Sequence, residues 1–257
     1  MKGFGDVLLT SPDGYKLYEA DIFSSGPSLF NVRACEIIGE KERNLFDRPH
    51  YDPNEALRVL FCYPTLKDLK TRPVYSLITD QIKHLMNGRK VTTKQFHYSV
   101  PDTGVGEQPI HSEESYEGKV GAIQRINYGI HLLENGLFPF HLGDYHIVLF
   151  VAVESDIDVR SMPNYDKANI VAYEYHSREP VGIMSRGPAV QREFFDITDK
   201  KTTYGQRLAS RFPVLHDDWH RLVCKHHRIL NCREAFIADA LVLLIAHRYL
   251  ENILAFF

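Results

Sequence analysis

The chain has 257 residues and a formal net charge of −3, with 44% hydrophobic and 25% charged residues. This length suffices for one large domain or two small ones, and the composition is that of an ordinary globular protein. The weak negative charge argues against a nucleic-acid-binding protein, whose domain would be strongly basic. No apolar stretch approaches the ~18 residues of a transmembrane helix, and no secretory signal opens the chain. None of the four cysteines forms a CxxC pair, so we expect reduced thiols in the cytoplasm.

The first hundred residues alternate apolar runs with turn formers. Five segments have the alternation or the apolar content of strands: residues 7–9, 15–23, 29–38, 57–63 and 90–100. Residues 74–86 instead carry apolar side chains at helical spacing, and Gly88 is placed to end that helix. Residues 101–118 are polar and rich in turn formers, which predicts an exposed loop. A second helix is predicted over 120–133, with Gly136 as its stop.

The most distinctive segment, residues 147–159, predicts one strand about twice the usual length of 5–6 residues. One of its faces is apolar along its whole length, whereas the other changes from apolar to charged at Glu154. A loop over 163–167 then leads to a second alternating run that ends near Ser177. The pair is either an ordinary hairpin over a core or an amphipathic hairpin able to cross a bilayer, which needs roughly 9–11 residues per strand.

Residues 187–203 are predicted to be irregular or to form short strands, and 216–257 to be mostly helical with a break near Asn231. The stretch 235–246 is apolar on nearly every side around the single charge of Asp239, which predicts burial. It is either a core helix or a helix that covers a membrane-active surface or contacts a second subunit. The last case would make the protein a non-enzymatic, dimeric interaction module.

A cluster of histidines and cysteines precedes this helix. On a helix, His216, His220, Cys224 and His227 would form one stripe, and histidines four residues apart can chelate zinc. One stripe places its ligands along a line, whereas tetrahedral sites usually draw them from at least two elements, so we expect no bound metal. The enzymatic alternative is a metal-dependent hydrolase that uses His216, Asp217 and His220.

The standard signatures of enzymes are missing from the sequence. It contains no GxSxG, no P-loop, no GxGxxG that opens a helix and no HExxH. We therefore predict a protein that is not an enzyme and has no cofactor. The predicted fold is α+β, a twisted and mostly antiparallel sheet with flanking helices. Residues 1–205 would form one domain, and 206–257 a helical segment packed on it.

The order of these segments resembles the pore-forming domain of gasdermins. The resemblance covers roughly residues 7–178. Its first part rests on the segment Phe46-Asp47-Arg48-Pro49-His50-Tyr51 and the apolar stretch 56–60 that follows it. Its second part rests on the strand after Asn87-Gly88, and then on the predicted helix 120–133, the long strand 147–159 and the run 169–173 in that order. The family's basic opening helix is reduced to residues 3–9, and its large C-terminal repressor domain has no counterpart. The chain is therefore most similar to the short fungal gasdermin-like cell-death proteins.

The resemblance implies a pore-forming protein that is cytoplasmic when inactive and moves to the cell membrane to trigger programmed cell death. Its partners would be anionic phospholipids and other copies of itself or of a sequence-divergent relative, with no nucleic acid. The expected residues of the membrane hairpin are Ile147, Leu149, Val151, Val153, Ile157, Val159, Val171, Tyr173 and Tyr175.

Charged residues would divide between the water-filled pore and the membrane surface. Glu154, Asp156 and Asp158 are expected to face the pore. The basic residues expected at lipid headgroups, each worth about 1 kcal/mol near an anionic surface, are Arg89, Lys90, Lys94, Lys200 and Lys201.

Overall fold

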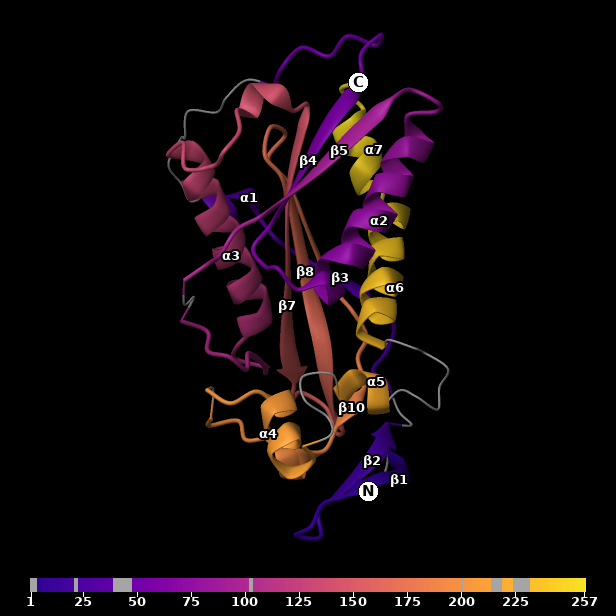
Figure 1. Cartoon of the computed structure of the whole chain (residues 1–257), viewed down its shortest axis with the longest axis vertical. Helices are drawn as coiled ribbons and strands as arrows, with labels where there is room; N and C mark the ends of the chain where they lie inside the picture. Colours follow the sequence, from indigo (N-terminus) through magenta and orange to yellow (C-terminus); the bar gives the residue numbers. More distant parts are fainter. Residues whose placement is uncertain are drawn as a thin grey trace.

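The computed structural model describes residues 4–20, 23–38, 48–101, 104–199, 201–213, 219–223 and 232–257. Within these ranges the chain forms an eight-stranded sheet and a separate two-stranded sheet, with helices packed around them (Figure 1). The α+β fold class predicted from the sequence is confirmed.

Six strands of the large sheet lie side by side in the order β3 (Ser28–Phe30), β9 (Glu179–Met184), β8 (Asn164–Glu174), β7 (Ile147–Asp158), β4 (Leu57–Tyr63) and β5 (Val91–His97). The pairs from β3 to β7 are antiparallel, whereas β4 runs parallel to both β5 and β7. Two short strands complete the sheet: β10 (Ala189–Val190) pairs with β8, and β6 (Ile110–His111) pairs in parallel with β7.

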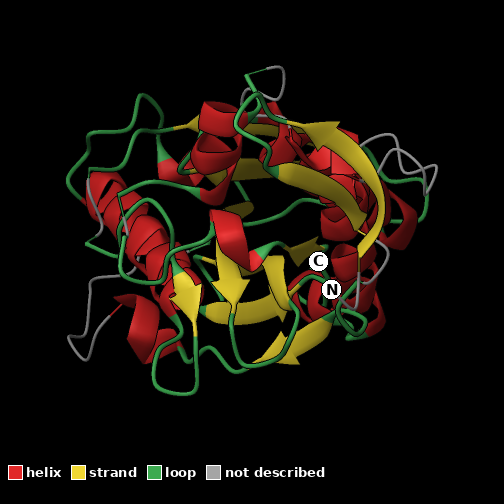
Figure 2. Cartoon of the chain, turned by 90° about the horizontal axis from the view of Figure 1, so that it is seen from below, coloured by secondary structure: helices red, strands yellow, loops and turns green. Residues whose placement is uncertain are grey.

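Helices cover both faces of this sheet. On one face α2 (Asp68–Leu85), α6 (Cys232–Ala246) and α7 (Tyr249–Leu254) enclose an apolar core. On the other face α1 (Ala34–Ile38) and α3 (Glu117–Glu134) enclose a second core (Figure 1). Viewed along the long axis, the sheet curves between these two groups of helices (Figure 2). Because each buried aliphatic or aromatic side chain contributes about 1.5–3 kcal/mol, the two cores fix the position of the central strands.

A third core closes one end of the molecule. It gathers β2 (Lys16–Ala20), α4 (Tyr204–Arg211), α5 (Trp219–Val223) and the short helical turn Arg192–Phe194. β1 (Phe4–Thr10) pairs with β2 at this end (Figure 1), so the strand pair expected around residues 11–14 is present. Elsewhere in the chain, another helical turn, Leu142–Asp144, precedes β7.

Two segments differ from their predictions. The strand expected over 29–38 ends at Phe30, and α1 begins at Ala34 because the Glu36 carboxylate accepts a hydrogen bond from the Arg33 amide at 2.6 Å. The expected exposed loop over 101–118 contains β6, and the side chains from Gln108 to His111 are buried. The elements in both segments are short, so their positions depend on partners that lie far away in the sequence.

Within the described residues the helical predictions hold, with shifted ends, whereas the break expected near Asn231 lies outside those residues. α2 starts at Asp68 rather than at residue 74, and Gly136 follows α3 with a φ of +67° that suits glycine. α6 places Ile237 and Leu241 in the core, but Val242 on its outer side is 56% exposed, so burial is one-sided. The boundary expected after residue 205 falls inside α4, and the division into two parts stays a prediction.

The long hairpin is confirmed as β7 and β8, strands of 12 and 11 residues. Its predicted faces are wrong in one respect. Val151 pairs with Ala172, so Val171 lies on the opposite face, together with Tyr173, Tyr175 and Phe150 in the core under α3. The residues assigned to the membrane hairpin therefore divide between two faces, and both faces are covered by helices.

The charged face of β7 is also not solvated as predicted. Glu154, Asp156 and Asp158 are only 9%, 0% and 3% exposed. Glycines let α3 approach closely, because a Cβ on Gly118 would lie 2.5 Å from Asp156 Oδ2. The polar alternation of this strand therefore reflects a buried polar layer between β7 and α3.

Candidate functional site

An opening in the sheet forms beside the middle of β7. β4 ends at Tyr63 and pairs with β7 only as far as Phe150, whereas β6 joins the same edge at Ile157. Among the described strands, none pairs with the intervening edge. The Val153 carbonyl in this stretch accepts a hydrogen bond from Lys70 Nζ at 2.7 Å instead. The opening lies beyond the carboxyl end of a parallel strand, where α/β sheets commonly bind ligands.

This opening is a cleft of about 240 Å³, called the central cleft below. It is bounded by the N-terminal turns of α2, α4 and α6, by α5, by α3 and by the segment before β6. Its lining residues are Pro64, Thr65, Lys67, Lys70, Glu107, Gln108, Arg125, Val153, Glu154, Ser155, Asp166, Thr203, Tyr204, Gly205, Trp219, His220 and Arg233.

Four cationic side chains from three helices meet in the central cleft: Lys67, Lys70, Arg125 and Arg233. The two arginines have carboxylate partners. Arg125 Nε lies 2.6 Å from Glu154 Oε2, although not aligned as a hydrogen bond, and Arg233 Nη2 donates to Asp166 Oδ2 at 2.7 Å. Among the described residues, neither lysine forms an ion pair. The lining therefore carries uncompensated positive charge.

The surroundings of Lys70 alter its ionisation. Burial lowers its pKa, Glu154 opposes this, and the charges of Arg233, Lys67 and Arg125 add to the effect of burial, so that the pKa falls from its ordinary value to about 8. A negatively charged ligand would relieve this repulsion. The electrostatics of the cleft thus favour an anion.

The start of α2 adds to this field. Lys67 is its N-cap residue, and no side chain caps the helix there. The N-terminus of a helix carries a partial positive charge and unpaired amide groups, which suit an anion. The adjoining Thr65 hydroxyl accepts a hydrogen bond from the Lys67 amide at 3.1 Å and lines the same cleft.

The floor of the central cleft is held in place by α4 and α5. Thr203 and Gln206 form a reciprocal capping box at the start of α4, and Gln108 Oε1 accepts a hydrogen bond from the Tyr204 amide at 2.8 Å. Trp219 fits against Gly205, where an added Cβ would lie 3.0 Å from its ring. This end of the cleft is therefore preorganised by protein contacts.

Asp166, on β8, links the floor to α6. It accepts hydrogen bonds from Arg233 and from His220 Nε2, the latter at 2.6 Å, and the His220 ring stacks on Trp219. Burial alone would raise the pKa of Asp166, but Arg233 and His220 outweigh it and hold the pKa below its ordinary value. Asp166 is therefore an ionised, buried carboxylate that positions two cleft side chains.

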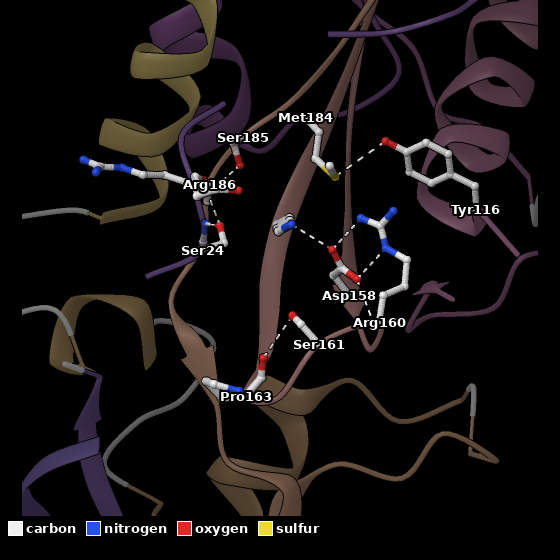
Figure 3. A network of polar contacts seen from close by, with 12 residues as sticks. Ser24, Tyr116, Asp158, Arg160, Ser161, Pro163, Met184, Ser185 and Arg186 are labelled. Atoms are coloured by element: carbon white, nitrogen blue, oxygen red, sulfur yellow. Dashed lines mark hydrogen bonds and ion pairs between the residues drawn. The ribbon is translucent and has the colours of Figure 1, made fainter. Parts of the chain in front are cut away.

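A separate polar network occupies the end of the β7–β8 hairpin (Figure 3). Asp158 accepts hydrogen bonds from Arg160 Nε at 2.9 Å and from Lys167 Nζ at 2.7 Å. Tyr116 donates to Met184 Sδ at 3.5 Å nearby (Figure 3). The cations hold the pKa of Asp158 far below its ordinary value, although burial opposes them. This network joins the hairpin to its neighbours and does not line the central cleft.

The residues expected at lipid headgroups do not gather on one surface. Arg89 and Lys90 are exposed between α2 and β5, and Lys94 is exposed on β5. Lys201 precedes α4 at the other end of the long axis (Figure 1). Lys200 lies outside the described residues.

Of the expected histidine cluster, the structure describes His220, which lies in the central cleft, whereas His216, Asp217, Cys224 and His227 fall outside the described residues. In the described part of the chain, no group of three His, Cys, Asp or Glu side chains is arranged to hold a metal. None of the helices in those ranges has both the length and the hydropathy needed to span a membrane.

Most of the cleft was not identified from the sequence. Lys67, Lys70, Arg125, Asp166 and Arg233 are far apart in the chain and belong to no motif. One signal was available: the apolar strand 57–63 is followed at once by Pro64-Thr65 and two lysines at the start of a helix. A strand, a short turn and a basic helix start form an arrangement that suits anion binding.

Comparisons with known proteins add little. No protein-family model matches the chain, and no curated protein matches it. Among solved structures, protein VC0702 from Vibrio cholerae is similar over 75% of this chain and 98% of that one, with 15% sequence identity and a TM-score of 0.46. A likeness at this level carries no argument about function.

Proposed function

We propose that this protein binds a small polyanionic ligand of the phosphate-ester class in the central cleft. The observation that supports it is the convergence of Lys67 and Lys70, which have no carboxylate partner among the described residues, with the oriented guanidinium groups of Arg125 and Arg233.

The chemistry of these groups favours phosphate over a single carboxylate. Lysines act as mobile point charges, and arginines present planar forks of donors that fit phosphate oxygens. Glu154 and Asp166 fix the two guanidinium groups before a ligand arrives, so less conformational entropy is lost on binding. Four cations against the three carboxylates of Glu107, Glu154 and Asp166 leave a net positive lining, which a multiply charged anion would balance.

Titration calorimetry and thermal unfolding of the purified chain with pyrophosphate test this proposal. We expect saturable binding and a stabilisation of about 2.7 kcal/mol at a hundred times Kd. Lys67→Ala should weaken binding at least about tenfold, since a charge-assisted hydrogen bond contributes roughly 1.5–3 kcal/mol. The matched control is Lys94→Ala, which removes an exposed lysine on β5 outside the cleft and should bind pyrophosphate like the wild type. No binding, or equal loss in both variants, would overturn the proposal.

Pore formation, as implied by the gasdermin resemblance, is a second proposal. The observation that favours it is the length of β7 and β8, 12 and 11 residues, which reaches the roughly 9–11 that a membrane-crossing strand needs. To cross a bilayer, the hairpin would have to leave the helices on both of its faces. Each fully buried apolar side chain released would cost about 1.5–3 kcal/mol before lipid replaced its contacts.

Dye release from anionic vesicles tests pore formation. We expect leakage from the chain alone or together with a sequence-divergent relative, and less leakage for an Arg89→Ala, Lys90→Ala double variant. These two residues are exposed and lie outside the central cleft, so the variant should still bind pyrophosphate. Vesicles that stay intact under both conditions would rule out this second function.

A further inference from the structure

Lys70 occupies an unusual position for a lysine. It lies in the first turn of α2, half-buried, and its ammonium donates to a backbone carbonyl, that of Val153, at 2.7 Å. Within the described residues, no carboxylate lies within ion-pair distance of it. A carbonyl oxygen can also accept from a neutral amine, although the bond is weaker than one from an ammonium, so the contact does not require the proton.

The surroundings of Lys70 disfavour its charged form. Three other cations, Lys67, Arg125 and Arg233, share the cleft with it. Burial and these charges outweigh the opposing charge of Glu154 and lower the pKa of Lys70 to about 8. About a tenth of the amine is then unprotonated at pH 7, roughly two-hundredfold more than for an ordinary lysine. Desolvation beside other cations is a recognised way to make a lysine nucleophilic.

We infer that Lys70 is a reactive amine that condenses with the carbonyl group of a phosphorylated aldehyde bound in the central cleft. The inference rests on the proposed function, because the phosphate of the ligand has to be held by Lys67, Arg125 and Arg233. With the phosphate on these three cations, a short aldehyde can place its carbonyl carbon against the fourth, Lys70.

The reaction is a dehydrating condensation that needs no oxidant or reductant. The Nζ lone pair forms a bond to the carbonyl carbon, which gives a carbinolamine. The carbon–oxygen bond then breaks, and the oxygen leaves as water with the two hydrogens that the neutral amine carried. The product is an imine between Lys70 and the ligand, and water hydrolyses it by the reverse path.

Trapping with a reductant tests the inference on the intact chain. The probe is glyceraldehyde 3-phosphate with sodium cyanoborohydride, whose hydride converts an imine into a stable secondary amine that peptide mass mapping can locate. We expect Lys70 to be modified first, well before exposed Lys94, and pyrophosphate to suppress the adduct. Glyceraldehyde, which lacks the phosphate, should react with Lys70 much more slowly. The rate at Lys70 should rise with pH up to about 8.

A matched pair of variants separates binding from reaction. Lys70→Arg keeps a positive charge but cannot form the imine, so it should lose the adduct while still binding pyrophosphate. Lys67→Arg should keep the Lys70 adduct. Pyrophosphate binding without preferential modification of Lys70 overturns the inference and leaves the proposed function standing. Failure of the wild type to bind pyrophosphate overturns both.

Discussion

The buried carboxyl of Asp156 gives the most direct test of the polar layer between β7 and α3. Its side chain is 0% exposed, neither of its oxygens has an aligned hydrogen-bond donor in the part of the chain that the structure describes, and α3 covers it at Gly118. Burial raises its pKa to about 8, helped by Asp158 and Asp166 and opposed by Asn169 and Lys167. We predict that Asp156→Asn stabilises the protein at alkaline pH, because an amide cannot ionise.

The sign follows from proton linkage. Between pH 5 and pH 8 the folded state keeps the proton on Asp156, whereas the unfolded chain, with a carboxyl pKa of about 3.9, has lost it. The contribution of Asp156 to stability is therefore greatest at low pH and falls as pH rises toward 8. Each pKa unit corresponds to about 1.4 kcal/mol, so three pH units give an upper limit of about 4 kcal/mol.

Urea unfolding at pH 5 and pH 8 measures this difference. The free energy of unfolding of Asp156→Asn, measured relative to that of the wild type, should increase by about 2–4 kcal/mol from pH 5 to pH 8. The lower figure allows for water penetration around the ionised group. Asp80→Asn, on the exposed side of α2, is the matched control and should follow the wild-type pH dependence. Equal effects at both pH values would show that Asp156 is ionised in the folded protein.

Three further substitutions test the packing around the cleft. Gly118→Ala should destabilise the chain by about 1–3 kcal/mol in urea unfolding, because its Cβ would overlap the polar layer, whereas Gly143→Ala meets open space and should be close to neutral. Leu241→Ala, fully buried on α6, should cost about 2–5 kcal/mol, against little for exposed Val242→Ala. Arg233→Ala should cost about 3–5 kcal/mol by leaving a buried carboxylate without its cation, and a melting temperature equal to that of the wild type would contradict this account of the cleft.

Local pattern was enough to find the main elements of the fold. The apolar run 57–63, the spacing of residues 74–86 and the long alternation from Ile147 correspond to β4, α2 and β7. What local pattern could not supply was which strands pair. β4 runs parallel to both β5 and β7, and the segments that contain α2 and α3 provide the long connections that parallel pairing requires. The residues of the strands themselves do not show whether two strands pair in the parallel or the antiparallel direction.

The polar residues of β7 show why burial was misjudged. Glu154, Asp156 and Asp158 occupy every second position, as charged residues do on the solvated face of a half-exposed strand. The structure buries them because Arg125 pairs with Glu154, Lys167 pairs with Asp158, and Gly118 leaves room for Asp156. These partners come from α3 and β8, so the difference between a wet face and a buried polar layer depends on tertiary contacts.

The same dependence on tertiary contacts explains why the cleft was missed. Four cations spread from Lys67 to Arg233 become neighbours only because β4 stops at Tyr63 while β7 continues, which opens the sheet where three helices begin. Of the candidate residues chosen from the sequence, Val153, Glu154 and His220 line that cleft.

The two proposed functions use the same hairpin and therefore oppose each other. Val153, Glu154 and Ser155 of β7 and Asp166 of β8 line the central cleft, so a hairpin that leaves the helices for a membrane destroys the anion site. A ligand that binds only the folded form stabilises it by about 2.7 kcal/mol at a hundred times Kd. If the chain does both, pyrophosphate at that concentration should reduce the population of membrane-inserted hairpins, and the leakage from anionic vesicles, by about a hundredfold. Lys67→Ala should reduce this protection from about a hundredfold to about tenfold or less without reducing leakage itself. Leakage that is insensitive to pyrophosphate in a chain shown to bind it would mean that the hairpin stays in place.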